Sequence, residues 1–361
     1  MNSPSLSSCR AGSGGAAVLL LAVLLSAGGC HSYLGEVIRW NMFEPTPHFQ
    51  PAAPTLDVAR LLAAPPAWVR LGHATTLVST PAGLLATDPL IFDRMHAFLG
   101  FGPRRITRLP AVDVKKLPVR VIVISHNHAD HYEPSSILQF NLKDVLLVLP
   151  PGIPLKDQQS FARAGARVEV LSWAGWEGKP AEAVSGELRI RAFPVNHWGT
   201  KCTPDYQCAN GYAIEAPGFR VAYFGDTAEL DFDDDRGSGF DLCLLPIGSN
   251  TYIENHVTPR QAWAIHTAAR CRHTTPIHWD TFIDEPRPRY CASTAEWRRW
   301  VDEPLCGLVL QAQATGRLAE LSCSGIGVVC TPELSGIDEA FLKRCQELAK
   351  GPHLRYRNQF E

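Results

Sequence analysis

The chain lacks several features that would each assign it to a class. Its 361 residues carry 34 Lys and Arg against 36 Asp and Glu, so no strong basic field points to nucleic acid. No two cysteines have the CxxC spacing of a cysteine zinc site, and we find no internal repeat. What remains is an ordinary globular composition, 45% hydrophobic and 19% charged, with ample length for a sizeable core.

A long hydrophobic run is also missing. The N-terminal apolar run, residues 16–27, is too short to span a bilayer comfortably but suits the core of a signal peptide. Small residues lead from it to Cys30, and the segment resembles a bacterial lipoprotein signal, in which this cysteine is lipidated. An uncleaved anchor and ordinary secretory cleavage are the alternatives. We therefore expect residues 1–30 to be a signal, and the protein to be exported to the bacterial cell envelope and lipid-anchored at Cys30.

The 11 cysteines are compatible with export. Without Cys9 and a lipidated Cys30 an odd number remains, so at least one stays unpaired within the chain. Two pairs are close enough to close small loops as disulfides: Cys202 with Cys208, and Cys323 with Cys330. Cys243 and Cys271 are interpreted as free, buried thiols.

A proline-rich tether, residues 31–65, precedes a region of short Val-, Leu- and Ile-rich runs, which are typical of strands. Strands are predicted over 68–79, 83–91, 119–125, 144–150, 167–173, 188–195, 211–216, 219–225 and 241–248. Helices are predicted from Thr258 onward, over 293–303 and over 337–350. This order predicts an α/β (α+β) fold, with two packed sheets and helices outside them.

Three histidines and one aspartate follow the buried run 119–125 within six residues: His126, His128, Asp130 and His131. Imidazole and carboxylate groups are ligands of Zn²⁺, and burying four such groups unpaired would be costly. Three further candidates each follow a short apolar run: His197, Asp226 and His278. Because loops after successive strands can converge on one edge, the sequence predicts a metal site there.

The HxHxDH motif followed by single His, Asp and His residues resembles the metallo-β-lactamase superfamily. The segments LGHATTLVS, TDPLIFDR, VIVISHNHADH, NHW, FGDTA, HVTPRQAWAIH and PIHWDTF occur in the order seen in N-acyl-phosphatidylethanolamine-hydrolysing phospholipase D. They are more loosely similar to ascorbate-6-phosphate lactonases. The resemblance covers about residues 66–285. It implies a four-layer αββα sandwich as a catalytic domain over 66–290, with 291–361 as a C-terminal extension packed on it.

The resemblance also implies a ligand set for two Zn²⁺ ions per chain, although another divalent metal would fit. One ion would be held by His126, His128 and His197, and the other by Asp130, His131 and His278, with Asp226 between them. Two metals about 3.5–4 Å apart can share a bridging hydroxide that attacks a phosphorus or a carbonyl carbon. Asp130 is a further catalytic candidate, because it would orient this hydroxide.

Other polar residues have more than one interpretation. His256 lies just before the helix that begins at Thr258, and is either a proton donor or phosphate contact, or a simple capping residue. His73 is interpreted as a supporting or strand-packing residue, and His266 as a core residue. Ser125 is discounted as a nucleophile activated by its neighbour, because adjacent residues of a strand point to opposite faces.

The leading functional hypothesis is a phosphodiesterase acting on a phospholipid-like substrate at a membrane surface, where a lipid anchor would hold it. The alternative is a lactonase or another carboxylic-ester hydrolase with the same site. A di-iron redox protein is disfavoured by His128, where such proteins typically carry Glu. A non-catalytic lipoprotein is disfavoured because no expected ligand is missing. We expect a small-molecule or lipid substrate and no nucleic acid, and the sequence leaves the oligomeric state open.

Overall fold

Two six-stranded sheets organise the computed structural model of the chain. It describes residues 55–63, 65–95, 105–173, 178–197, 208–232, 237–248, 256–282, 294–322, 325–326, 328–333 and 337–350. The predicted signal, Cys30 and most of the proline-rich tether lie outside the described residues. None of the described helices combines the length and the apolar character needed to cross a bilayer.

The first sheet has the order β1-β2-β3-β4-β5-β6. Its strands are β1 (Ala67–Gly72), β2 (Thr75–Thr80), β3 (Gly83–Thr87), β4 (Val119–Val123), β5 (Leu146–Leu149) and β6 (Arg167–Val170). The first three are antiparallel, and β3 to β6 are parallel. The single strand predicted over 68–79 is wrong, because the chain reverses at His73 and Ala74. Gly72 and His73 both have positive φ, 116° and 50°, which permits this tight turn.

The second sheet has the order β12-β11-β10-β9-β8-β7. Its strands are β7 (Glu182–Ser185), β8 (Leu188–Pro194), β9 (Asn210–Ala216), β10 (Phe219–Tyr223), β11 (Phe240–Pro246) and β12 (Cys271–Ile277). Strands β10, β11 and β12 are parallel, and the remaining neighbours are antiparallel. The short strand β7 and the strand β12 are absent from the sequence prediction.

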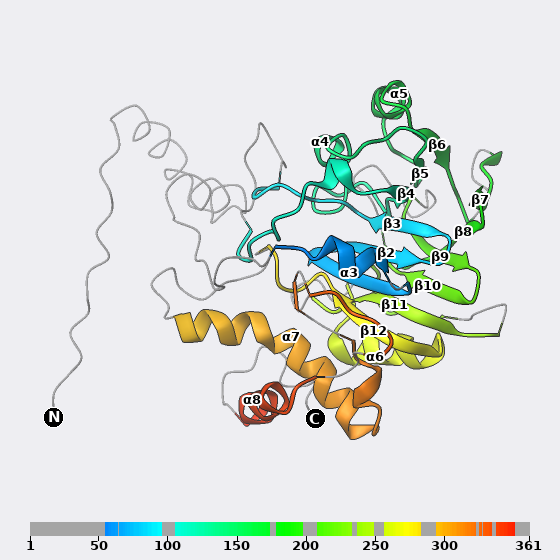
Figure 1. Ribbon diagram of the computed structural model, residues 1–361. Coiled ribbons are helices and arrows are strands. Elements are labelled where there is room, and N and C mark those ends of the chain that lie inside the picture. The colour runs from blue at the N-terminus through cyan, green and yellow to red at the C-terminus, as the bar shows by residue number, and fades with distance from the viewer. Residues whose placement is uncertain are drawn as a thin grey trace, which may run out of the picture.

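The helices fall into two groups. Those near the first sheet are α3 (Val58–Ala63), α4 (Pro134–Ile137) and α5 (Leu155–Arg163). Those near the second are α6 (Pro259–Ala268), α7 (Thr294–Ala314) and α8 (Glu339–Ala349), which gather at the end of the molecule away from α4 and α5 (Figure 1). Thr258 caps α6, as the sequence predicts, and Gln261 completes a capping box with it. Helix α7 is longer than predicted and continues through Pro304.

Three apolar layers hold these elements together. Ile122 of the first sheet packs with Phe161 of α5, and its neighbour Val121 faces the other way, into a layer shared with Ile214 of the second sheet. A third layer joins the outer face of the second sheet to α6, α7 and α8, and includes Trp263. Helix, sheet, sheet and helix are therefore stacked in the predicted αββα order.

The segment that follows α7 pairs with the outermost strands of both sheets. The Ser322 N–H donates to the Thr274 carbonyl of β12 at 2.9 Å. Farther along, Cys330 and Trp68 of β1 exchange two backbone hydrogen bonds, of 2.8 and 2.9 Å. This segment therefore covers one edge of each sheet.

All of the described cysteines are disulfide-bonded: Cys208, Cys243, Cys271, Cys306, Cys330 and Cys345. Cys243 and Cys271 bond to each other across the neighbouring strands β11 and β12, so their interpretation as free thiols is wrong. Cys306 joins α7 to Cys345 of α8. Cys202 and Cys323 lie outside the described residues, so their pairing with Cys208 and Cys330 stays a prediction.

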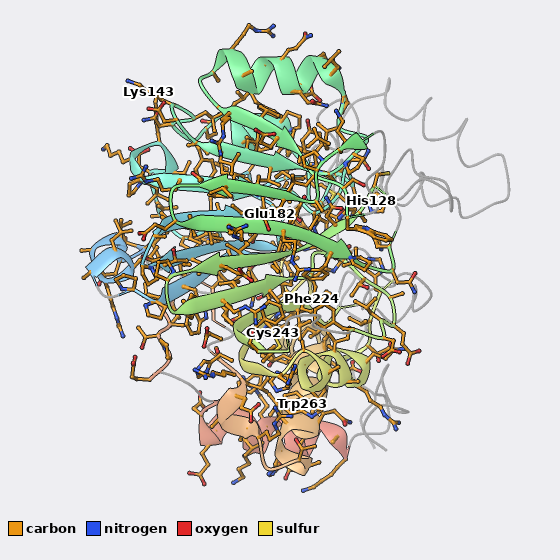
Figure 2. All side chains as sticks on the ribbon, turned by 90° about the vertical axis from the view of Figure 1, so that its right-hand side faces the viewer. His128, Lys143, Glu182, Phe224, Cys243 and Trp263 are labelled. Carbon is orange, nitrogen blue, oxygen red and sulfur yellow. A yellow bond between two sulfur atoms is a disulfide. The ribbon has the colours of Figure 1, made fainter. Side chains whose placement is uncertain are left out.

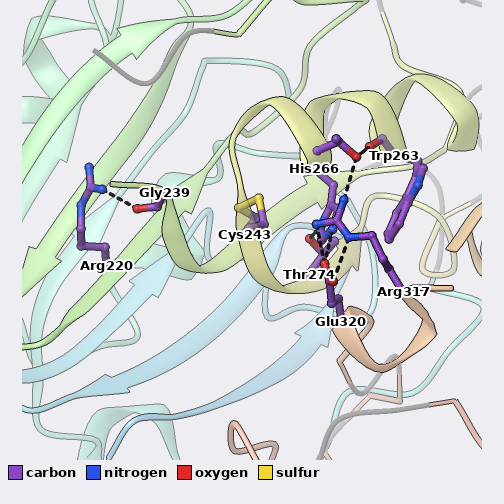
Figure 3. Close-up of a disulfide and its surroundings, with 10 residues drawn as sticks. Arg220, Gly239, Cys243, Trp263, His266, Thr274, Arg317 and Glu320 are labelled. Carbon is purple, nitrogen blue, oxygen red and sulfur yellow. Dashed lines mark hydrogen bonds and ion pairs between the residues drawn. A yellow bond between two sulfur atoms is a disulfide. The ribbon is translucent and has the colours of Figure 1, made fainter. Parts of the chain in front are cut away.

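His266 is a core residue, as predicted, and both of its ring nitrogens have partners (Figure 3). The Thr274 hydroxyl contacts Nδ1 at 2.8 Å, and Nε2–H donates to Glu320 Oε2 at 2.8 Å. The ring also stacks on Trp263, with centroids 4.1 Å apart. Burial lowers the pKa of His266 to about 4, because the charged form loses its hydration.

This buried imidazole predicts an acid-sensitive stability. An unfolded chain protonates the residue near its usual pKa of 6.5, whereas the folded protein resists until about pH 4. The contribution is therefore complete above pH 6.5 and is lost as the pH falls toward 4, by about 3 kcal/mol in total. We expect His266→Gln to lose less stability than the wild type between pH 7 and pH 4.5 in urea unfolding. Equal losses in the two proteins would contradict this.

Candidate metal centre

The seven predicted ligands lie past the carboxyl ends of four strands. Residues 126–131 follow β4, His197 follows β8, Asp226 follows β10 and His278 follows β12. Figure 2 labels His128 at this end of the sheets, with Lys143 at the opposite end. Residues as far apart in the sequence as His126 and His278 are therefore brought to one edge of the sandwich.

Three histidines form one group, as the sequence predicts. His128 Nδ1 lies 2.9 Å from His126 Nε2 and 3.2 Å from His197 Nε2. Imidazole nitrogens that share one metal at about 2.1 Å are expected about 3.0–3.4 Å apart. The group therefore has the spacing of a common metal site.

The second predicted group also assembles, around Asp130. Its Oδ2 atom lies 3.2 Å from His278 Nε2 and 3.6 Å from His131 Nε2. His73, which the sequence gives a supporting or packing role, places Nε2 3.1 Å from the same oxygen. All of these side chains except that of Asp130 are almost completely buried.

Asp226 lies between the two groups. Its Oδ2 atom is 3.2 Å from Nε2 of both His131 and His278. The same oxygen is 3.9 Å from His126 Nε2 and 3.8 Å from His197 Nε2. A single carboxylate therefore faces ligands of both groups, as predicted for a residue between two metals.

The electrostatics of the centre favour positive charge around Asp226. Burial lowers the pKa of His126 well below its usual range, and neighbouring histidines lower it further. Burial would also lower the pKa of His131, but Asp226 and Asp130 outweigh this effect and raise it to about 10. Burial raises the pKa of a carboxyl, yet His131 and His278 hold that of Asp226 well below its usual range.

Asp88, for which the sequence analysis has no role, supports His131 directly and His126 through Ser125. The His131 Nδ1–H donates to Asp88 Oδ2 at 2.6 Å, and this leaves Nε2 directed at Asp226. The Ser125 hydroxyl donates to the same oxygen at 2.5 Å, and Tyr223 of the opposite sheet also donates to it. Its position after a strand could have indicated such a role, because Asp88 directly follows β3 and Asp226 lies three residues after the end of β10.

Ser125 also contacts a ligand directly. Its Oγ atom lies 3.0 Å from His126 Nδ1, so the expectation that adjacent residues diverge is wrong here, because both residues lie past the end of β4. The hydroxyl is nevertheless buried and committed to Asp88. It orients His126, and the geometry gives it no access to a substrate.

His256 lies on the far side of Asp226. Its Nε2 atom is 3.1 Å from Asp226 Oδ2, and its Nδ1 atom is buried with no hydrogen-bond partner in the described part of the chain. The residue stands two positions before Thr258, which caps α6 with its side chain. Helix capping belongs to Thr258, so that interpretation of His256 is wrong, whereas its role as a proton donor or phosphate contact stays a prediction.

These residues fit a pair of divalent metal ions. Five imidazoles and two carboxylates are the borderline ligands that Zn²⁺ and similar ions prefer. The potential donor atoms fall into groups whose members lie within 4.8 Å of one another. Asp226 Oδ1 is buried without a hydrogen-bond partner among the described residues, as expected of a carboxylate whose second oxygen is reserved for a cation.

Comparison with known proteins agrees with this geometry. A sequence profile described as the β-lactamase superfamily domain matches residues 90–279, slightly more than half of the chain. The chain belongs to the metallo-β-lactamase superfamily. Within it, the chain lies close to the phospholipase branch that its motifs resemble.

Three similar proteins illustrate this placement. N-acyl-phosphatidylethanolamine-hydrolyzing phospholipase D 1 of Caenorhabditis elegans is 30% identical over 59% of this chain and 63% of its own. A mitochondrial N-acyl-phosphatidylethanolamine-hydrolyzing phospholipase D of Saccharomyces cerevisiae is 26% identical over 62% and 50%. The chain thus matches less than two thirds of either phospholipase. An isothiocyanate hydrolase from Delia radicum gut bacteria superimposes with a TM-score of 0.52 at 13% identity, covering 75% of this chain and all of that one, which shows a shared fold.

The role of Asp88 predicts the effect of Asp88→Asn. Asparagine has one acceptor oxygen where Asp88 uses two, so either the Ser125 N–H or the donors at Oδ2, His131 among them, would face an NH2 group. The support of the ligands is therefore weakened, and metal affinity should fall about 10–100-fold. Isothermal titration of the metal-free protein with Zn²⁺ measures this. The matched control is Asp113→Asn, since Asp113 is an exposed carboxylate that forms an ion pair with Lys116 of the same turn. Unchanged affinity in Asp88→Asn would show that the hydrogen bond does not support binding.

Proposed function

We propose that the protein is a dinuclear zinc phosphodiesterase acting on phospholipid-like substrates. The observation that carries this proposal is the position of Asp226 Oδ2, within 3.9 Å of ligands from both histidine-containing groups. The similarity to two phospholipases of the D type supports a phosphodiester rather than another substrate. When bound, a metal pair supplies a nucleophile from water at neutral pH and polarises the phosphoryl oxygen.

The residues divide the remaining work. His126, His128 and His197 would hold one ion, and Asp130, His131 and His278 the other, with Asp226 fixing their separation. In the hydrolysis, a bond forms between the water oxygen and phosphorus, and the bond from phosphorus to the leaving alcohol oxygen breaks. That oxygen needs a proton, and we assign its delivery to His256, whose Nε2 lies 3.1 Å from Asp226 Oδ2 and whose side chain is 16% exposed at the centre.

The neighbourhood of His256 also favours an anionic substrate. The residue stands two positions before Thr258, the cap of α6, and the dipole of this helix attracts negative charge to its N-terminal end. A phosphodiester carries such a charge, and a lactone does not.

The assignment predicts distinct effects for two variants. Asp226→Ala should lower metal content and reduce turnover of a phosphodiester by about 1,000-fold, or about 4 kcal/mol. His256→Ala should keep its metal and lose about 100-fold in turnover, because only the proton donor is removed. Metal content is measured by mass spectrometry, and turnover on phosphatidylethanolamine derivatives and on lactones. Asp231→Ala, an exposed carboxylate after the same strand, is the control.

Two results would contradict the proposal. Full phosphodiesterase activity in Asp226→Ala would remove the bridging role. Hydrolysis of lactones alone, by a zinc-loaded wild type, would replace the phosphodiesterase with a carboxylic-ester hydrolase built on the same centre.

We further propose that the protein is exported and lipid-anchored at Cys30 on a membrane surface. The oxidised state of every described cysteine supports export, because disulfides persist mainly in oxidising compartments. A surface anchor would hold the enzyme beside a lipid substrate.

This second proposal predicts that Cys30→Ser moves the protein out of the membrane fraction. Fractionation of cells producing each form measures the change, and mass spectrometry of the mature N-terminus identifies the lipid. Retention of Cys30→Ser in the membrane fraction would exclude anchoring through this residue.

A further inference from the structure

His73 touches the second ligand group through both its ring and its backbone. Nε2 of the ring lies 3.1 Å from Asp130 Oδ2, and the His73 carbonyl accepts the His278 N–H at 3.2 Å. The His73 N–H in turn donates to the Thr281 hydroxyl. One residue in a two-residue turn thus contacts two of the three residues assigned to one metal.

The backbone around this contact is held in an unusual conformation. Five described residues other than glycine have positive φ: His73, Asp88, Asp144, Arg270 and His278. Three of them meet at the metal centre. Such conformations persist where surrounding contacts fix them, and they gather at functional sites. The turn at His73 is therefore built to deliver its side chain to this position.

Packing alone does not account for an imidazole here. The ring contacts Phe282 edge-on with centroids 5.4 Å apart, and it lies 4.1 Å from the His278 ring. A phenyl ring would fill the same space without bringing a polar nitrogen into a nearly closed environment, where an unpaired nitrogen is unfavourable. The nitrogen is instead aimed at the carboxylate of Asp130.

We propose that His73 is a positioning residue for the second metal. Its Nε2–H donates to Asp130 Oδ2 and fixes that carboxylate, while its carbonyl fixes the backbone of His278. The proposal assigns no such role to His73 in the first group, because Asp130 and His278 belong to the second, while His126, His128 and His197 approach one another at 2.9 and 3.2 Å. The proposal rests on the two-metal centre of the proposed function.

Two substitutions at the same position separate the hydrogen bond from the packing. His73→Phe keeps a ring and removes the donor, whereas His73→Gln keeps an N–H donor. Both place a side chain on the same positive φ, so the backbone strain is largely common to them. Zn²⁺ titration of the metal-free proteins gives the affinity of each binding step, and the visible spectrum of Co²⁺-loaded protein reports the ligand field. His278→Ala and His197→Ala identify which step belongs to which group.

In His73→Phe, the Zn²⁺ affinity of the binding step that is lost in His278→Ala should fall about 10–100-fold. The Zn²⁺ affinity of the step that is lost in His197→Ala should stay within about twofold of the wild type. His73→Gln should recover most of the loss, and its Co²⁺ spectrum should stay close to that of the wild type. If the wild type binds fewer than two metals, the proposed function itself fails. If it binds two, and His73→Phe binds both equally well or loses both equally, only the role of His73 is overturned.

Discussion

The structure depends on the burial of one carboxylate, that of Asp226, among five imidazole rings. An anion removed from water is strongly unfavourable unless opposite charge or directed donors replace its hydration. Here five Nε2 atoms approach Oδ2 within 3.9 Å, and the side chain is 1% exposed. The rings come from the ends of β4, β8 and β12 and from the entry to α6, so these ends must meet for the charge to be accommodated. The packing of the sandwich and the geometry of the candidate centre therefore depend on each other.

The supporting residues extend this dependence to the packing of the two sheets. Asp88 belongs to the first sheet and Tyr223 to the second, and they hydrogen-bond across the layer between them. Asp88 also holds His131 directly and His126 through Ser125. A change in how the sheets pack would therefore reach both groups of ligands. Since buried polar networks are favourable only when every member is satisfied, the interior of the sandwich is constrained by chemistry as well as by volume.

The sequence predicts the ligands well because their signal is local. Four of the seven lie within one hexapeptide, and the others each follow an apolar run, so a strand-end rule suffices to find them. The same rule does not single out Asp88, because a lone aspartate before Pro89 equally suits a turn. Contacts made across the fold carry no local signal at all. The register of β11 and β12 brings Cys243 near Cys271, and the packing of α7 on α8 brings Cys306 near Cys345, neither of which sequence spacing indicates.

The turn at His73 illustrates a related limit. The run 68–79 is apolar and β-branched enough to predict one long strand, yet Gly72 and His73 break it into a hairpin. Local propensity favours continuation, and the contacts of His73 with Asp130 and His278 favour reversal. The tertiary contacts prevail, and the residue that sequence reasoning places in a supporting or packing role comes to lie against the ligands.

The backbone pairing of the segment after α7 bears on whether copies of the protein associate with one another. Strands β1 and β12 are the adjacent outer strands of the two sheets, and an uncovered strand edge is a template on which another chain can add itself. By pairing with Thr274 and with Trp68, Ser322 and Cys330 occupy part of that template from within the same molecule. Loss of these two pairings would expose both strand edges, and self-association of the protein is the expected consequence.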